Sequence, residues 1–384
     1  MSSQNYDVIV IGARCAGAAT AMLMARKGLR VLLAERAAPG TDTLSSHNLT
    51  RGAVTQLARW GVVDRLIKMG TPRITQSVFH FGEDALALDL KPAMGAPGLL
   101  GTRRAILDAT LVDAAREAGV DVRFHTSFKD VIRNAEGRVT GAVLSSDEDE
   151  LIVKAPLVVG ADGMRSTVAR RVGAAMQKEA KNALGHIYSY YRGLPLAESH
   201  LFFGPGALIA STPTDHGADI VIATITPEKL RQMRLEVGDR GALERLAVLA
   251  NPEFANLLGK AEMIEPVRAF SGTKGFSRNC AGPGWALVGD AGYFRDPVTA
   301  HGITDAFRDA ELLANAAGKG DAALTDYQLK RDEITRDIWE ITDQIAAFDM
   351  RLEELQTAYH RLSRAMRAEQ EWMASEFDPT ALAA

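Results

Sequence analysis

The sequence predicts an α/β fold with a parallel sheet flanked by helices, an inserted and mainly antiparallel β-sheet, and a C-terminal helical segment. Three short apolar runs predict the parallel sheet, because a run without polar alternation is typical of a strand buried on both faces. These runs end at Gly12, Gly160 and Gly289. Residues 18–27 are strong helix formers between the first run and an apolar strand at 29–34, which completes a strand–helix–strand unit.

The composition is that of a globular protein without a bias toward polyanionic partners. The chain has 384 residues, a length that favours two to three domains, and its formal net charge is −4. We therefore expect no nucleic-acid partner and no polybasic membrane anchor. No apolar stretch is long enough to span a membrane, and the start of the chain lacks a signal-peptide pattern, so a cytoplasmic location is expected. Two cysteines are too few for a disulfide scaffold.

The turn after the first strand reads GARCAG from residue 12 and has the context of a dinucleotide-binding fingerprint. Gly12 allows a tight turn, and Gly17 allows the helix to pack closely on the strand. A pyrophosphate would lie on the helix N-terminus, and Glu35 would accept hydrogen bonds from ribose hydroxyls. Arg14 replaces the usual middle glycine and is interpreted as a guanidinium over the pyrophosphate. The alternative is an ordinary strand–turn–helix unit that binds nothing.

Two later turns repeat the strand-then-glycine pattern. An Asp-Gly turn at residues 162–163 follows a buried strand, and Ser166 is placed to cap the next helix. A Gly-Asp turn at residues 289–290 follows another short strand, and a further helix is expected to begin near Gly302. An acid at a strand end is well placed to hold a hydroxyl of a bound cofactor, and the later helix start would offer free N–H groups.

Together the three motifs resemble the class A FAD-dependent monooxygenases related to para-hydroxybenzoate hydroxylase. The motifs are GARCAG, ADGMRS near residue 162 and LVGDAGYFRDPVTAHGITDA from residue 287, and the resemblance covers roughly residues 5–320. Geranylgeranyl reductases and flavin-dependent halogenases share this fold. Asp296-Pro297-Val298 looks halogenase-like, but the halogenase motif Trp-x-Trp-x-Ile-Pro is absent. The resemblance implies a Rossmann-like FAD-binding domain.

The resemblance also implies a role for each matching residue. The matching positions contact ADP (Gly12, Gly17, Glu35), the pyrophosphate (Arg104), adenine through the backbone (Val131), FAD and the pyridine nucleotide (Asp162), the ribityl chain (Asp290) and the isoalloxazine ring (Pro297 to Ile303). The full set of candidate FAD contacts is Gly12, Ala13, Arg14, Ala16, Gly17, Glu35, Arg36, Ser46, Arg104, Val131, Asp162, Asp290, Gly302 and Ile303.

His301, His47 and Pro297 are the candidate catalytic residues. His301 stands just before the glycine of the ring-lining loop, where its charge would stabilise a negatively charged reduced flavin; the alternative is a loop histidine without such a role. His47 follows the second strand, where the family's chain approaches the flavin, and is a candidate base or substrate contact. Pro297 belongs to the ring-lining loop. No cluster has metal-ligand spacing, so no metal is expected.

The segment between residues 176 and 280 is expected to bind the substrate. Residues 207–211 and 219–224 predict two strands with a turn at 213–217, as in an antiparallel sheet. Tyr188 and Tyr190 share one face of a strand because they are two residues apart. With Phe270 they are candidate contacts to a planar, apolar substrate, and ordinary core packing is the alternative.

The predicted organisation has three parts. The FAD-binding domain comprises residues 1–75, 100–175 and 281–320, the substrate domain comprises 76–99 and 176–280, and C-terminal helices comprise 321–384. Helical periodicity of isoleucines in the last part predicts helices that pack on the FAD-binding domain or on a partner subunit. A monomer or homodimer is expected, without the extra C-terminal module of larger phenol hydroxylases.

The resemblance implies an FAD-dependent monooxygenase that uses NAD(P)H and O₂. It would hydroxylate a small aromatic or polycyclic organic substrate through a C4a-hydroperoxyflavin, while the protein supplies orientation and excludes water. The alternative enzyme is an FAD-dependent reductase or dehydrogenase of the geranylgeranyl reductase type, which acts on C=C bonds. A non-enzymatic FAD carrier is the third hypothesis.

Overall fold

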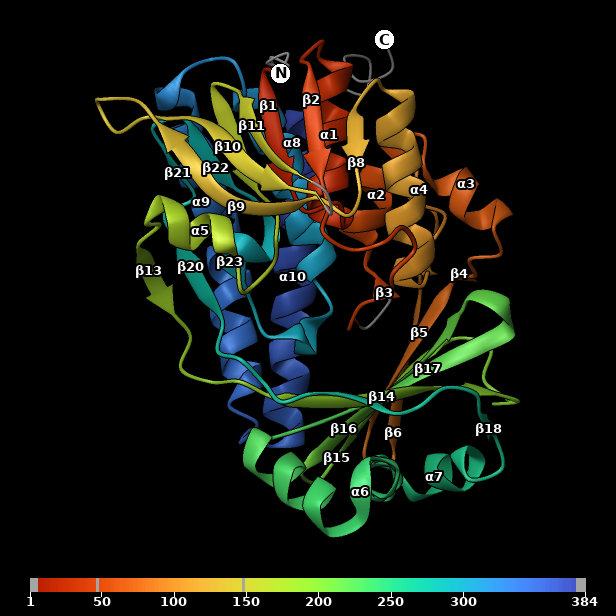
Figure 1. Cartoon of the computed structure of the whole chain (residues 1–384). Coiled ribbons are helices and arrows are strands. Elements are labelled where there is room, and N and C mark those ends of the chain that lie inside the picture. Colours follow the sequence, from red (N-terminus) through yellow and green to blue (C-terminus); the bar gives the residue numbers. More distant parts are fainter. Residues whose placement is uncertain (1–5, 46–47, 147–148, 378–384) are drawn as a thin grey trace.

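A six-stranded sheet forms the centre of the upper part of the molecule in the computed structural model, which describes residues 6–45, 48–146 and 149–377 (Figure 1). Neighbouring strands of this sheet run parallel to each other, except for the antiparallel pair β21–β22 at one edge. The spatial order is β21 (Ala281–Gly282), β22 (Trp285–Leu287), β12 (Leu157–Gly160), β1 (Val8–Ile11), β2 (Val31–Ala34) and β8 (Asp121–Arg123). The predicted parallel sheet is therefore present.

Helices cover this sheet and bury its apolar strands. Helix α1 (Cys15–Arg26) packs between α4 (Arg104–Glu117) and α8 (Gly302–Ala316), and β1 is buried along its whole length. The remaining helices of this part are α2 (Arg51–Arg59), α3 (Val63–Lys68) and α5 (Thr167–Val172). The first helix begins three residues before the predicted start, and the second strand begins two residues after its predicted start. The strand starts late because the N–H of Leu29 turns back to the carbonyl oxygen of Met24.

Three small sheets surround the central one. The first is antiparallel and consists of β9 (Ser127–Arg133), β10 (Val139–Ser145) and β11 (Glu150–Lys154). The second joins β3 (Asn48–Leu49), β7 (Leu99–Gly101) and β4 (Arg73–Ile74). The third joins β13 (Met176–Glu179), β20 (Phe276–Arg278) and β23 (Tyr293–Phe294), so it pairs chain segments from both sides of a predicted domain boundary. The exact boundaries stay a prediction.

An eight-stranded sheet lies below, and seven of its strands follow one path. The order is β18 (Glu262–Met263), β14 (Gly185–Arg192), β17 (Ala218–Ile225), β16 (Ala207–Thr214), β15 (Ser199–Gly204), β5 (Gln76–Phe81) and β6 (Asp84–Asp89), with β19 (Arg268–Phe270) paired to β14. All pairs are antiparallel except β5–β15. The two predicted strands lie within β16 and β17. The turn between them is shorter than predicted, because β16 continues to Thr214.

Helices α6 (Pro227–Ala250) and α7 (Pro252–Leu258) cover one face of the eight-stranded sheet (Figure 1). Ile187 and Val221 project from the sheet into the core that these helices complete. Because side chains alternate along a strand, His186, Tyr188 and Tyr190 lie on the opposite face of β14. This second face, called the inner face below, contacts the upper part of the molecule.

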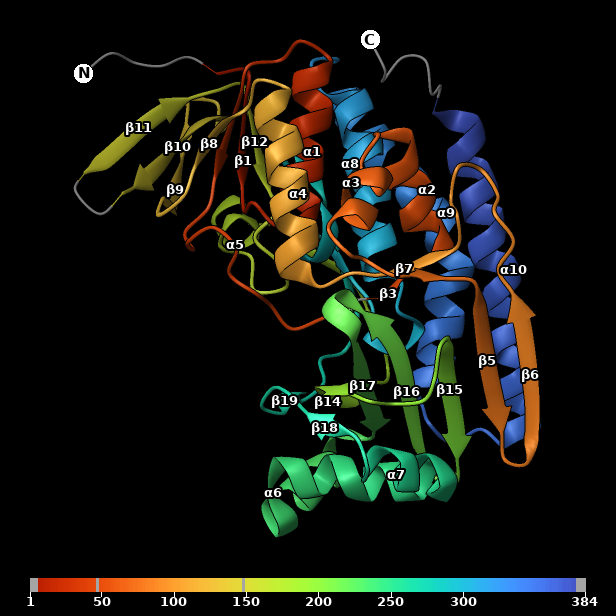
Figure 2. The same cartoon turned by 90° about the vertical axis from the view of Figure 1, so that its right-hand side faces the viewer.

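The C-terminal helices α9 (Asp321–Ala346) and α10 (Leu352–Glu376) lie side by side and pass both parts of the molecule (Figure 2). The predicted isoleucine stripe is buried between them at Ile338, Ile341 and Ile345. At its lower end α10 packs on the eight-stranded sheet, where Tyr359 meets the rings of Phe79 and Phe203. The predicted docking of these helices on the upper part is confirmed through α2 and α8.

Among the described helices, none combines the length and the apolar character that a membrane crossing requires.

Gly17→Ala is expected to destabilise the protein by at least about 3 kcal/mol, the upper end of ordinary overpacking. A Cβ at this position would lie 1.7 Å from the carbonyl oxygen of Gly12, and only a backbone shift relieves such a clash. Denaturant unfolding measures the effect. Gly259→Ala is the control, because its φ is −65° and the nearest atom to its Cβ would lie at 3.4 Å. Equal stability of the two variants would contradict the close packing of α1 on the turn.

Candidate functional site

Glu35 stabilises the turn between β1 and α1. Gly12 has a φ of +102°, a conformation that strains any residue with a side chain. Beside it, Glu35 at the end of β2 accepts the N–H of Ala13 on Oε2 at 2.8 Å and the N–H of Ala37 on Oε1 at 2.9 Å. A carboxylate therefore lies at the N-terminus of α1, and its contact with a ribose stays a prediction.

Arg14 connects this turn to the segment that follows β2. Its exposed guanidinium donates a hydrogen bond to Oγ1 of Thr43. Arg36 is also exposed. The predicted contacts of both arginines with the cofactor stay predictions. Ser46 and His47 lie outside the described residues.

A buried ion pair lies behind the turn. Arg104, the first residue of α4, donates to Asp108 from Nε at 3.1 Å and from Nη2 at 3.0 Å, and Asp108 also accepts the backbone N–H of Cys15. Burial would lower the pKa of Arg104, but Asp108 and its other anionic neighbours raise it above its usual range. Arg104 is therefore a fixed positive charge beside the start of α1, where the sequence predicts the pyrophosphate.

The carboxylate of Asp290 accepts no hydrogen bond from the described part of the chain. Asp290 lies in the short 3₁₀ helix η2 (Gly289–Ala291). Burial raises the pKa of Asp290 to about 7, since desolvation and repulsion by Asp305 and Asp309 outweigh the attraction of Arg104. Such a carboxyl suits the hydroxyl groups of a ligand.

Asp162 caps α5 in this structure. Its Oδ1 accepts the hydroxyl of Ser166 at 2.5 Å, and its Oδ2 accepts the backbone N–H of Thr167 at 2.6 Å. Ser166 in turn accepts the N–H of Ala169, which confirms the predicted cap. Val131 lies half-buried in β9. The cofactor contacts predicted for Asp162 and Val131 stay predictions.

The loop before α8 is capped at its start and leads to an exposed helix N-terminus. Asp296 accepts the N–H of Val298 at 3.0 Å and caps the 3₁₀ helix η3 (Pro297–Thr299). Ala300 then adopts a φ of +51°, which is uncommon for a residue with a side chain. Gly302 begins α8 and is exposed, and a Cβ there would meet no atom within 4 Å. The helix N-terminus therefore faces open space, as a bound ring would require.

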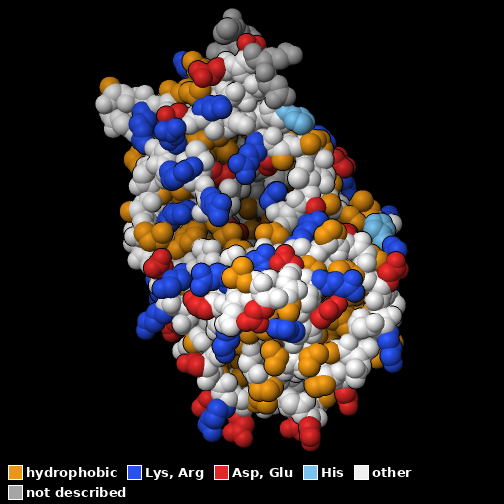
Figure 3. Space-filling model, turned by 60° about the horizontal axis from the view of Figure 1, so that its bottom comes forward, with side chains coloured by type: hydrophobic (Ala, Val, Ile, Leu, Met, Phe, Trp, Pro, Cys, Tyr) orange, Lys and Arg blue, Asp and Glu red, His pale blue; other side chains and the backbone are white. Residues whose placement is uncertain are grey.

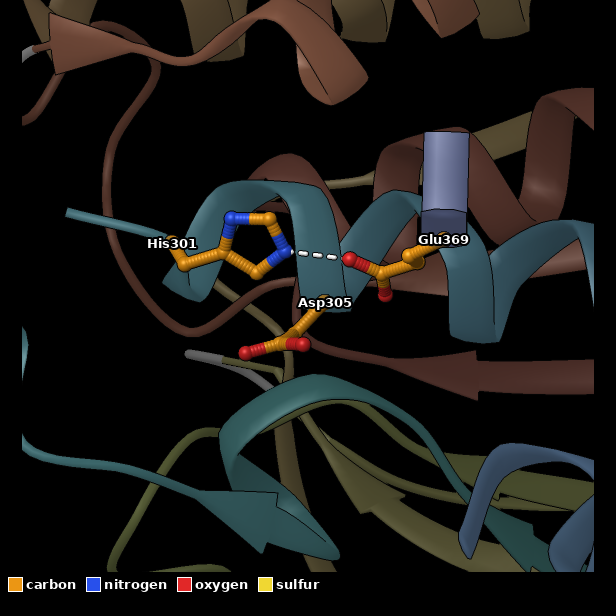
Figure 4. A group of neighbouring side chains, drawn as sticks. All are labelled: His301, Asp305 and Glu369. Atoms are coloured by element: carbon orange, nitrogen blue, oxygen red, sulfur yellow. Dashed lines mark hydrogen bonds and ion pairs between the residues drawn. The ribbon is translucent and has the colours of Figure 1, made fainter. Parts of the chain in front are cut away.

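His301 is buried beside this opening. Its Nε2 lies 2.5 Å from Oε2 of Glu369, which comes from α10, and Figure 4 shows this edge of the ring turned toward Glu369. Its other ring nitrogen, Nδ1, is buried without a described partner. The sequence placed His301 in the loop, but nothing in the sequence indicated its buried carboxylate partner.

The inner face of β14 carries the candidate substrate residues. The rings of Tyr188 and Tyr190 lie on one face, as predicted, with centroids 6.1 Å apart. The guanidinium of Arg103 lies 3.8 Å from the centroid of the Tyr190 ring and pairs with Glu265. Tyr190 is therefore covered by Arg103, and Tyr188 is the more central of the two on this face. Both side chains are buried and pack with Ile220 in one small apolar cluster, as the alternative of core packing predicts. Their contacts with a substrate stay predictions.

His186 connects the same face to the loop before α8. Its Nε2 lies 3.3 Å from Oδ1 of Asp296, and its Nδ1 lies 2.9 Å from Oγ1 of Thr224. Asp296 also accepts the N–H of Leu184 at 2.7 Å. Phe270, opposite His186 across the β14–β19 pair, stacks on its ring at 6.1 Å. His186, Tyr188 and Tyr190 thus form a row along the inner face, with the loop before α8 at one end and Arg103 at the other.

A hollow lies between the upper and lower parts of the molecule, and several Lys and Arg side chains border it (Figure 3). A cavity rimmed by positive charge suits a ligand that carries phosphate groups. The loop before α8 and the inner face meet where Asp296 contacts His186 and accepts the N–H of Leu184.

His186 and Glu369 are site residues that the sequence analysis did not identify, and only His186 has a signal in the sequence. His186 stands two residues before Tyr188 and shares its strand face, so the alternation that identified the tyrosines also indicates His186. Glu369 has no such signal. It is one of many glutamates in an amphipathic helix, and its burial follows from how α10 docks.

The chain matches the protein family described as FAD binding domain over residues 5–341. The digeranylgeranylglycerophospholipid reductase of Methanothrix thermoacetophila is 26% identical over 338 residues, which cover 83% of this chain and 80% of that protein. The flavin-dependent brominase Bmp2 has a similar structure, with a TM-score of 0.80, 20% identity, and coverage of 96% of this chain and 94% of that one. PqsL of Pseudomonas aeruginosa, named a probable FAD-dependent monooxygenase, has a TM-score of 0.78 at 18% identity and coverage of 95% and 100%.

Asp290→Asn is expected to make the ligand-free protein more stable above about pH 7. The folded-state pKa of about 7 lies above the ordinary value of 3.8, so the folded protein binds this proton more tightly than the unfolded chain does. Wild-type stability is therefore lost as the pH rises from about 4 to about 7, and Asn has no proton to lose.

Thermal unfolding at several pH values measures this difference between wild type and variant. Asp84→Asn, at an exposed position of β6, is the control and should show a constant difference from wild type. A constant difference for Asp290→Asn as well would contradict the raised pKa.

Proposed function

The chain belongs to the FAD binding domain family, and from this premise we propose that it is a monooxygenase that uses NAD(P)H and O₂. It is an FAD-dependent oxidoreductase. The proposed substrate is a small aromatic or polycyclic organic molecule, which is hydroxylated. The similarity of fold to PqsL supports an oxygen-inserting reaction.

The observation that carries the proposal is the aromatic inner face of β14 beside the loop that precedes α8. Tyr188 lies on this face between His186, which contacts the loop, and Tyr190. Apolar rings on the floor of a site recognise planar ligands by stacking and edge contacts. A substrate on this floor would lie next to the exposed start of α8 at Gly302.

The residues present fit FAD. The turn at Gly12 and the N-terminus of α1 would hold the pyrophosphate, Glu35 the ribose, and Asp290 the ribityl chain, while Gly302 leaves room for the ring. When bound, FAD would supply the transfer of two electrons from NAD(P)H to O₂, with one oxygen atom delivered to the substrate and the other released as water.

The chain's own residues orient the substrate and exclude water. The hydrogen bond from the N–H of Leu184 to Asp296, at 2.7 Å, joins the start of β14 to the loop, and a fixed floor keeps the reacting carbon at a constant place. Arg103 closes the other end of the floor over Tyr190. A closed site prevents reactive oxygen species from leaking into water before transfer.

A second candidate is a reductase that saturates C=C bonds. The relative from Methanothrix is named a digeranylgeranylglycerophospholipid reductase. One feature of the inner face favours the reduction of a C=C bond. Ile222, Ala210 and Leu201 continue the row that begins at Tyr188 across three neighbouring strands, and all three are only partly buried. An apolar row of this kind suits an extended hydrocarbon chain.

Oxygen separates the two candidates. In air, a substrate is expected to stimulate NAD(P)H oxidation and to leave as a product that carries one atom of ¹⁸O from ¹⁸O₂, detected by mass spectrometry. Without oxygen, no product is expected. The control omits the substrate and gives the background rate of NAD(P)H oxidation. Formation of a hydrogenated product in strict anaerobiosis would establish the reductase and refute the monooxygenase.

A further inference from the structure

One row of apolar side chains on the inner face is accessible, while the rows on both sides of it are buried. The accessible row crosses β17, β16, β15, β5 and β6, because each member pairs with the next across neighbouring strands. Its members, called the apolar strip below, are Ile222, Ala210, Leu201, Phe79 and Leu86, and all five are partly exposed. Five strands at a spacing of about 4.8 Å give the strip a length of about 19 Å.

The buried rows limit the width of the apolar strip. One row contains Thr224, Leu208, Phe203 and Phe81, and the other contains Ile220, Thr212, Ser199 and Ser77. None of these residues is more than 9% exposed. The accessible surface between them is therefore one residue wide, which suits an unbranched hydrocarbon chain better than a broad ring system.

Tyr359 of α10 lies beside the apolar strip. Its ring centroid is 6.0 Å from that of Phe79, a member of the strip, and 5.0 Å from that of Phe203 in the neighbouring row. Val298, from the loop before α8, packs into the same apolar cluster. Figure 2 shows α10 alongside β5 and β6. Tyr359 is therefore placed where the strip, the loop and the last described helix meet.

The hydroxyl group of Tyr359 is buried and has no hydrogen-bond partner among the described residues. Burial and the negative charge of Asp296 both raise the pKa of Tyr359, so the phenol keeps its proton at neutral pH and can donate it. Its neighbours in the cluster are apolar, among them Leu201 and Leu208. A buried donor without an acceptor is costly, and a ligand oxygen that accepts the hydrogen bond removes this cost.

Tyr327 of α9 shows the ordinary arrangement of a buried phenol. It is 2% exposed, and its hydroxyl group donates a hydrogen bond to the carbonyl oxygen of Leu287 at 2.7 Å. A buried tyrosine hydroxyl usually finds such an acceptor within the protein. Tyr359 departs from this rule at a position next to an accessible apolar surface, which points to an acceptor on a bound molecule.

A bound water molecule is the competing explanation for the hydroxyl group of Tyr359. A buried water usually makes about three hydrogen bonds. The cluster around Tyr359 is apolar, and the carboxylate of Asp296 already accepts the N–H groups of Val298 and Leu184. The surroundings therefore offer a water few partners. The two explanations also differ in the stability that they predict for a variant without the hydroxyl group.

We propose that Tyr359 is a specificity-determining residue that donates a hydrogen bond to a carbonyl or hydroxyl oxygen of the substrate, while an unbranched hydrocarbon chain of the same substrate lies on the apolar strip. The inference rests on the proposed function, which places the substrate on the inner face. It narrows the substrate class to molecules that carry both an oxygen acceptor and a hydrocarbon chain. The chain extends from the side of Tyr188 toward β6.

Thermal unfolding of the holoprotein without substrate is the first test. The midpoint of Tyr359→Phe is expected to equal or exceed that of wild type, because the variant removes a donor that has no acceptor. Tyr327→Phe is the matched control. Its midpoint is expected to fall, because it removes a donor whose acceptor, the carbonyl oxygen of Leu287, stays buried.

Calorimetric titration of the holoprotein with alkyl phenyl ketones is the second test. Each ketone has a planar ring, one acceptor oxygen and an unbranched chain, and the alkylbenzene of equal length has CH₂ in place of the carbonyl group. Wild type and Tyr327→Phe are expected to bind the ketone about tenfold more tightly than the alkylbenzene. Tyr359→Phe is expected to bind the two equally.

The length of the alkyl chain tests the apolar strip. Each added CH₂ group is expected to raise the affinity about fourfold until the chain reaches β6. Ala210→Phe fills the middle of the strip and is expected to abolish this gain. Ala85→Phe is the control and should retain the gain, because Ala85 is exposed on the opposite face of β6.

Three results would overturn the proposal: a midpoint of Tyr359→Phe below that of wild type, a preference for the ketone that Tyr359→Phe keeps, or a wild-type affinity that does not depend on chain length. None of these measurements needs turnover. A protein that binds the ketones as expected but forms no hydroxylated product would contradict the proposed function alone. Hydroxylation of a compact substrate by a protein that binds none of the ketones would contradict this inference alone.

Discussion

The close approach of α1 to the turn after β1 is the constraint on which the rest of the site depends. No atom larger than hydrogen fits at Gly17 against the carbonyl oxygen of Gly12, and Gly12 itself would place a Cβ 2.5 Å from the carbonyl oxygen of Ala161. These contacts fix the N-terminus of α1 against β12. They also bring Ala16 next to Gly289, where a Cβ would lie 3.0 Å away. The turn at residue 12 and the turn at residue 289, distant in the sequence, are thus one structural unit.

Two separate contacts align the lower sheet with this unit. At one end of β14, His186 meets Asp296 of the loop, and at the other end Arg103 covers Tyr190. Because Arg103 immediately precedes α4 and Asp296 precedes α8, each contact ties the inner face to an element that packs on α1. The inner face and the turn at Gly12 are therefore held by the same helices.

The sequence was most informative where local patterns decide the structure. Apolar runs, glycine turns and the cap at Ser166 gave the upper sheet and its helices, because each depends on neighbouring residues. The glycines of the three motifs are present for different structural reasons. Gly160 is needed because a Cβ would lie 2.7 Å from the side chain of Leu287, an internal packing reason, whereas a Cβ at Gly302 would meet no atom within 4 Å. Glu369 was beyond prediction, since its partner His301 is 68 residues away and only tertiary docking joins them.

A network of buried ion pairs near the start of α8 is built from two distant parts of the chain. Arg295, His301, Asp305, Arg308 and Asp309 lie within fifteen residues of one another, but Glu369, which contacts His301 and Arg308, lies on α10, the last described helix. During synthesis, Arg308 and His301 remain without this carboxylate until α10 has left the ribosome and docked. The loop beside Gly302 therefore acquires this buried ion-pair partner only after α10 has been synthesised and has docked.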